Sequence, residues 1–153
     1  MESNSAPKVS SSLDIIKNEK IGYNSHIIID SKELTEVYHY SREFMTFFDY
    51  KLLTIKLSIP FTGNNTKGAR SRVILYLDDE ELCDGSMYNT YEWELKPLHL
   101  EGIGVNIKAG NHKLKLQCCV DIGALYIPHF SIGCIENTVK PSMFGKLIII
   151  GQN

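Results

Sequence analysis

Several features that define other protein classes are missing from this 153-residue sequence. A membrane-spanning helix needs about 20 consecutive apolar residues, and the longest aliphatic runs here are HIIID and KLIIIG. The N-terminal stretch MESNSAPKVSSS lacks the apolar segment of a signal peptide. We therefore expect no membrane insertion. We expect a secreted or surface location if the sequence belongs to a longer chain, and a cytoplasmic one if it is complete.

Concentrated charge is also missing. The net charge is −2, and acidic and basic residues are interspersed along the chain. A nucleic-acid-binding protein needs a concentrated basic surface to contact phosphates, so nucleic acid is not an expected partner. The apolar fraction of 43% and the charged fraction of 22% are those of an ordinary globular protein.

Motifs for catalysis and for metal binding are absent as well. No histidine is spaced from another ligand as a metal site requires, and there is no C-x-x-C pair. The acidic run DDEE at 78–81 has two interpretations, a calcium site or a solvated turn, and we favour the turn. GIGVNI contains only a bare G-x-G, which does not open a helix. We predict a non-enzymatic protein without metal or cofactor. The five histidines are His26, His39, His99, His112 and His129.

Short extended segments separated by turn residues fill most of the sequence. KLLTIKLSIPF alternates cleanly, and we expect Pro60 to end its ladder. RVILYLDDEEL predicts a strand, a tight turn and a short return strand. YEWELKPLHLEGIGVNI reads as extended, with Trp93 and Leu95 in phase, and KAGNH as a turn.

Eight to ten such strands, with turns roughly every ten residues, predict an all-β protein: an antiparallel β-sandwich of the jelly-roll type. Residues 31–50 are the hardest to assign, although their β-branched and aromatic content favours extended chain. Residues 1–12 are polar and predicted to be disordered. Residues 13–153 are predicted to form a single domain.

The strand KLKLQCCV contains two adjacent cysteines whose side chains must point to opposite sides of the sheet. Cys118 continues the Leu114–Leu116 side and is predicted to be buried. Cys119 continues the lysine side and is predicted to be more accessible. We favour free thiols, and a disulfide from either cysteine to Cys83 or Cys134 remains the alternative.

The layout of residues 51–150 resembles a known superfamily. Its features are the LYLD strand, the PLHLEG strand, the AGNH turn leading into KLKLQ, a glycine-marked strand and the final KLIII strand. These resemble the trimeric jelly-roll domains of the tumour-necrosis-factor and complement globular-head type, as found in phage tails and microbial surface proteins. The resemblance implies a ten-stranded sandwich that forms a homotrimer and acts in adhesion, receptor binding or scaffolding, with no catalytic residues.

Two aliphatic runs independently indicate self-association. LIII (147–150) and HIII (26–29) are apolar on both sides of the strand, and in an antiparallel sandwich such a strand must be covered on both sides. We predict that a neighbouring subunit covers one side. The alternative is that both runs are central strands within one chain. The predicted interface residues are Ile27, Ile29, Ile148 and Ile150.

The leading functional hypothesis is therefore a homotrimeric jelly-roll module for binding, adhesion or scaffolding, with a protein or a glycan as its ligand. The alternative is a carbohydrate-binding, lectin-like sandwich. In that case Tyr88, Tyr91 and Trp93, in the polar and aromatic stretch CDGSMYNTYEW, stack on sugar rings. For Trp93 we favour packing in the core.

Overall fold

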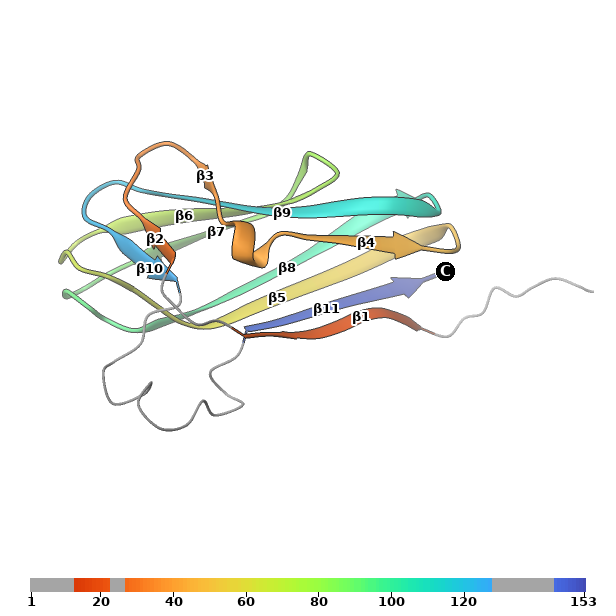
Figure 1. The fold of residues 1–153 in the computed structure, drawn as a ribbon, viewed down its shortest axis with the longest axis horizontal. Coiled ribbons are helices and arrows are strands. Elements are labelled where there is room, and N and C mark those ends of the chain that lie inside the picture. Colours follow the sequence, from red (N-terminus) through yellow and green to blue (C-terminus); the bar gives the residue numbers. More distant parts are fainter. Residues whose placement is uncertain (1–12, 23–26, 128–144) are drawn as a thin grey trace, which may run out of the picture.

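The computed structural model describes residues 13–22, 27–127 and 145–153 and shows two antiparallel sheets packed face to face (Figure 1). This arrangement confirms the predicted all-β jelly-roll sandwich. The six-stranded sheet contains β1 (Asp14–Ile21), β11 (Gly145–Gln152), β5 (Tyr50–Asn64), β8 (Lys96–Ile107), β10 (Leu125–Ile127) and β2 (Ile27–Ile29). The five-stranded sheet contains β3 (Thr35–Glu36), β4 (Arg42–Thr46), β9 (Gly110–Val120), β6 (Arg70–Leu77) and β7 (Glu80–Tyr88).

The core lies between the two sheets and is filled by every second residue of the long strands. On β5 and on β9 the alternation expected from the sequence is confirmed, because the predicted apolar side of each strand is almost completely buried. The core residues of these two strands are Leu53, Ile55, Leu57 and Ile59 on β5, and Leu114, Leu116, Cys118 and Val120 on β9.

The prediction that Pro60 ends its strand is wrong. Strand β5 continues through Pro60 to Asn64, and its pairing with β8 shifts register between Ile59 and Thr62. A proline donates no hydrogen bond to the ladder, and a bulge is one of the places where a sheet tolerates it. The extension carries β5 past β8 to β10, which pairs with Gly63 and Asn64. Asn64, the last residue of β5, is buried.

The two predicted tight turns are confirmed. Asp78 and Asp79, between β6 and β7, both adopt positive φ angles, of 50° and 69°. Such angles are typical of two-residue hairpins, and aspartate tolerates them better than most residues. After β8, the chain reverses at Lys108 and Ala109 and enters β9 at Gly110, whose φ is 137°. His112 Nε2 donates a 2.7 Å hydrogen bond to the Lys108 carbonyl.

The GIG stretch of β8 has a packing role. A Cβ atom added at Gly102 would lie 2.5 Å from Leu82 Cγ, and one at Gly104 would lie 2.9 Å from a methyl of Leu77. Both leucines belong to the β6–β7 hairpin of the opposite sheet. Because these glycines have no side chain, that hairpin closes tightly onto β8.

Residues 31–50 contain the strands β3 and β4, in line with the predicted extended chain, and one 3-10 turn over Tyr38–Tyr40 between them. Their aromatic residues separate into two groups. The rings of Tyr40, Phe44 and Tyr50 are buried in the core, whereas those of Tyr38, Phe47 and Phe48 are exposed. Phe47 and Phe48 lie in the turn between β4 and β5.

Candidate functional site

The outer side of the six-stranded sheet carries an exposed group of aliphatic side chains, which we call the apolar face. Ile15, Ile103 and Val105 are 70%, 53% and 61% exposed. Ile15 comes from β1, and Ile103 and Val105 come from β8. The strands β11 and β5 lie between β1 and β8 in the sheet. Outward residues of β11 and β5 connect the two sides. Ile150 of β11 pairs with Ile15 on one side and with Thr54 of β5 on the other. Thr54 pairs with Ile103 of β8. The members of the apolar face are Ile15, Leu52, Ile103, Val105, Ile148 and Ile150.

The four residues predicted for a subunit interface divide between the two sides of this sheet. On β11, Leu147 and Ile149 are buried in the core, so Ile148 and Ile150 point outward and belong to the apolar face. On β2 the direction is reversed from the predicted one. Ile27 and Ile29 are opposite Ile127 and Leu125 and pack in or against the core.

The outward residue of β2 is Ile28, which is 52% exposed. Three consecutive isoleucines contain no alternation from which their direction can be predicted. Ile29, at 3% exposure, has almost no surface left for a neighbouring subunit.

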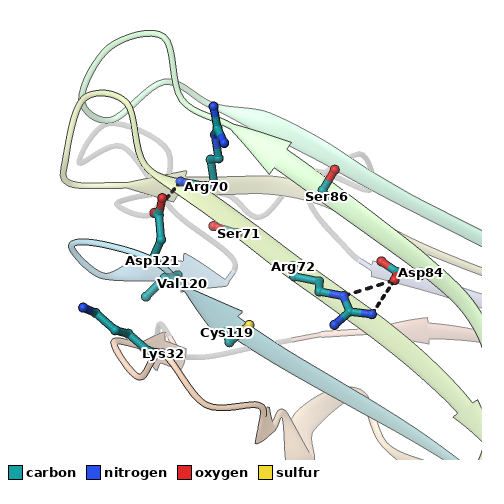
Figure 2. A pocket seen from close by; sticks show the side chains of 9 residues that line it. All are labelled: Lys32, Arg70, Ser71, Arg72, Asp84, Ser86, Cys119, Val120 and Asp121. Atoms are coloured by element: carbon teal, nitrogen blue, oxygen red, sulfur yellow. Dashed lines mark hydrogen bonds and ion pairs between the residues drawn. The ribbon is translucent and has the colours of Figure 1, made fainter.

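The outer side of the five-stranded sheet is charged and contains an open hollow of about 580 Å³. Strands β6, β7 and β9 form its floor, and the loop between β2 and β3 borders it (Figure 2). This volume lies in the range of about 300–1,000 Å³ that small-molecule sites usually have. The hollow is lined by Lys32, Arg70, Ser71, Arg72, Asp84, Ser86, Cys119, Val120 and Asp121.

Two of the carboxylates at the hollow already have partners. Asp84 Oδ2 accepts hydrogen bonds from Arg72 Nε at 3.1 Å and Nη2 at 2.8 Å. The hydrogen bond to Asp84 is the main reason why the pKa of Arg72 is raised, so its guanidinium stays charged. Asp121 Oδ1 accepts from the backbone N–H groups of Arg70 and Ile122, each at 2.7 Å. The first of these bonds is the main cause of the lowered pKa of Asp121.

The three aromatic residues predicted for sugar binding do not share one surface. Tyr88, at the end of β7, lies beside the hollow, where the guanidinium of Arg70 is 5.7 Å from the centre of its ring. Trp93 instead packs edge-on against Tyr126 of β10, with ring centroids 5.0 Å apart, on the six-stranded sheet. Tyr91 is exposed in the loop between these two residues.

The core position favoured for Trp93 is wrong. Its side chain is 40% exposed, and its φ of 58° places it in a turn before β8, which begins only at Lys96. The backbone N–H of Trp93 donates to the backbone carbonyl of Asn64 at 2.7 Å, which fixes this turn against the end of β5. The assumed strand phase, with Trp93 and Leu95 together, therefore does not exist.

The cysteines follow the predicted alternation. Cys118 is completely buried, and burial raises the pKa of its thiol to about 12. Cys119 is partly exposed and lines the hollow. Cys83, Cys118 and Cys119 are free thiols, so no bridge joins any two of them. Cys134 lies outside the described residues.

Lys32, Arg70 and Arg72 were not predicted as site residues. The alternation of ARSRV does place Arg70 and Arg72 on the side opposite Val73, and that pattern was a usable signal. Nothing in the sequence connects Lys32 to β6, because that contact depends on how the β2–β3 loop folds back. Within the described residues, no group of three or more His, Cys, Asp or Glu side chains is placed to hold a metal ion.

None of the helices in the described part of the chain is long and apolar enough to cross a membrane.

Comparisons with known proteins give similarity in structure only. No protein-family model matches the sequence. No curated protein matches it either. Among solved structures, a family 35 carbohydrate-binding module from an environmental isolate matches with a TM-score of 0.42 and 15% identity, over 94% of this chain and 93% of that one.

Two further solved structures illustrate the range of similar proteins. The Eiger TNF from S. frugiperda matches with a TM-score of 0.46 and 11% identity, over 91% of this chain and 92% of that one. The VP2 subviral particle of infectious bursal disease virus matches with a TM-score of 0.47 and 9% identity, over 94% of this chain and 38% of that one. These similarities assign neither a ligand nor an assembly to this chain.

Proposed function

We propose that this chain is a non-enzymatic binding module that holds a carbohydrate in the hollow of its five-stranded sheet. The observation that carries the proposal is the hollow itself, about 580 Å³ in volume and lined by hydroxyl, carboxylate and guanidinium groups. Sugars present hydroxyl groups that both donate and accept hydrogen bonds, so a mixed polar lining suits them.

An aromatic ring beside the hollow supports a sugar in particular. Tyr88 is half exposed, and the guanidinium of its cross-strand neighbour Arg70 lies 5.7 Å from the centre of its ring. An exposed aromatic ring offers an apolar surface on which the C–H groups of a sugar ring can stack. Tyr88 is the one of the three predicted sugar-binding aromatics that contacts a residue of the hollow.

The test is a glycan array followed by calorimetry on the best ligand. Replacing Tyr88 by alanine should weaken binding roughly tenfold, equivalent to about 1.4 kcal/mol. The matched control is Tyr91→Ala, which removes a similarly exposed tyrosine from the loop between β7 and β8. If the unaltered protein binds no glycan, or if both variants bind equally well, the proposal fails.

A second candidate function, self-assembly, is supported by the apolar face. Ile15, Ile103 and Val105 are each more than half exposed on one side of one sheet, and isolated subunits rarely leave such a group uncovered. We propose that copies of the chain cover this face by forming a homotrimer. Sedimentation at micromolar concentration should then give about three times the mass of 17.3 kDa. A monomer throughout that concentration range would contradict the homotrimer.

A further inference from the structure

The charges around the hollow do not balance. Lys32, Arg70 and Arg72 contribute three positive charges, and Asp84 and Asp121 contribute two negative ones. The whole chain has a net charge of −2, so this local positive excess does not follow from its composition. It is a property of how the fold arranges these five residues.

The positive excess resides on two specific side chains. Arg72 is paired with Asp84, whereas Asp121, which accepts from two backbone N–H groups and has a lowered pKa, keeps its negative charge. Lys32 and Arg70, neither of which forms an ion pair within the described residues, together outweigh Asp121 by one positive charge. The guanidinium of Arg70 lies over the ring of Tyr88.

The fold holds both residues in place at the border of the hollow. The N–H of Val120 donates to the carbonyl of Ser31 at 2.9 Å, which docks the β2–β3 loop on the end of β9 and brings Lys32 beside the hollow. The backbone N–H of Arg70 donates to Asp121 Oδ1, and the backbone N–H of Asp121 donates to the carbonyl of Arg70. Figure 2 shows Lys32 and Arg70 near the end of the hollow where Asp121 lies, with the Arg72–Asp84 pair farther along the strands.

We propose that the hollow binds an acidic saccharide, a sugar bearing a carboxylate or sulfate group, and that Lys32 and Arg70 contact its anionic group. This inference rests on the proposed carbohydrate-binding function. Charge-assisted hydrogen bonds from lysine and arginine are roughly twice as strong as neutral ones. The volume of about 580 Å³ is much larger than an inorganic anion needs, and the hydroxyl of Ser86 and the ring of Tyr88 suit the sugar itself.

The experiment compares two matched probes by calorimetry: oligosaccharides of a hexuronic acid, and the same oligosaccharides after their carboxylates are reduced to neutral alcohols. We expect the acidic form to bind at least about tenfold more tightly, with an affinity that falls as salt is added. Array panels of sulfated sugars and their desulfated forms provide the same comparison for sulfate.

Variants then locate the contact. Lys32→Gln combined with Arg70→Gln should remove the preference for the acidic form, and Lys32→Arg combined with Arg70→Lys should retain it. Glutamine at position 70 keeps the backbone N–H that Asp121 binds, so the loop should stay intact. The matched control is Lys20→Gln, which removes an exposed lysine of β1 on the other sheet.

The outcomes distinguish a failure of the acidic-saccharide inference from a failure of the proposed carbohydrate-binding function. If acidic and neutral forms bind equally, the acidic specificity is wrong and carbohydrate binding stands. If neither binds and no array glycan does, both are wrong. If inorganic sulfate displaces the saccharide at equal concentration, the hollow is an anion site, and the inference of saccharide recognition is overturned.

Discussion

The outer sides of the two sheets are opposite in character, although the inner sides share one core. The six-stranded sheet presents the aliphatic side chains of Ile15, Ile103 and Val105 to solvent. At equivalent outward positions the five-stranded sheet presents Arg72 and Asp84, which form an ion pair between β6 and β7. It also presents Lys115, which forms an ion pair with Asp79 in the β6–β7 turn. Both sheets follow the same period of two, so the difference lies only in the residues chosen for the outward positions.

From this difference in outward residues we infer that the two faces have different roles. Side chains at outward positions of a sheet do not pack in the core, so polar residues there favour solubility. Apolar residues at such positions call for a different explanation, such as contact with another molecule. We propose that a protein surface covers the apolar face. We propose that the charged face, with its hollow, binds a small polar ligand. Four changes test this comparison, and they follow in order of decreasing expected effect.

The largest effect should come from moving a charge from the outer to the inner side of one strand. Ile149→Asp places a carboxylate in the core, where the isoleucine is completely buried, and should destabilise the fold by at least about 3 kcal/mol. Ile148→Asp, one residue earlier and pointing outward, should leave the fold intact. Urea unfolding followed by circular dichroism measures both. Equal stability of the two variants would show that the direction of β11 has been misassigned.

The second change converts the apolar face to a charged one. Ile103→Asp combined with Val105→Asp should yield a folded protein that no longer associates, because two carboxylates would have to be desolvated at the interface. The control is Gln117→Asp, on the outer side of β9, which should not alter the mass. Sedimentation of all three proteins is the measurement. Unchanged association of the double variant would remove the apolar face from the interface.

The third test uses the cysteine pair as reporters of the two sides of β9. Cys119 should react with a maleimide in the native state, and Cys118 should not, because it is buried and its pKa is about 12.

The ordinary thiol pKa is 9.0, so between about pH 9 and 12 the unfolded chain binds fewer protons than the folded one. Stability should therefore decrease as the pH rises through this window. Replacing Cys118 by alanine should flatten this part of the pH profile, and equal labelling of both cysteines would contradict the assigned sides.

The smallest effect should come from the most conspicuous ion pair. Arg72→Gln removes the contact to Asp84, but both side chains are substantially exposed, and exposed pairs contribute roughly 0–1 kcal/mol. We expect a shift of that size in urea unfolding. A loss above about 2 kcal/mol would mean that Arg72 supports the fold as well as the hollow.

The sequence predicted the parts of the fold that local chemistry determines. Clean alternation on β5 and β9 set which side chains are buried, and the aspartates and Gly110 marked turns whose backbone angles they tolerate. The predictions failed where local patterns are ambiguous. Three isoleucines in β2 have no alternation, and Trp93 lies beyond the start of the strand to which it was assigned.

The candidate site was less predictable for a physical reason. Its lining comes from β6, β7, β9 and the β2–β3 loop, which are separated in the sequence and meet only after both sheets have formed. Tyr88 was predicted as a sugar-binding residue from its polar and aromatic neighbours in the sequence. Its ring contacts Arg70, which lines the hollow, and its role in binding stays a prediction. Lys32 has no local signal, since its position depends on the backbone contact between Ser31 and Val120.

The position of β11 also affects how the protein is made. This strand is the last of the described residues to be synthesised, yet it lies between β1 and β5 in the middle of its sheet (Figure 1). Until residue 152 has left the ribosome, β1 has no partner strand and one edge of β5 is open. Nascent chains on the same messenger would then expose unpaired strand edges to each other. Completion of this sheet must therefore wait until β11 has been synthesised, and that delay follows from the strand order itself.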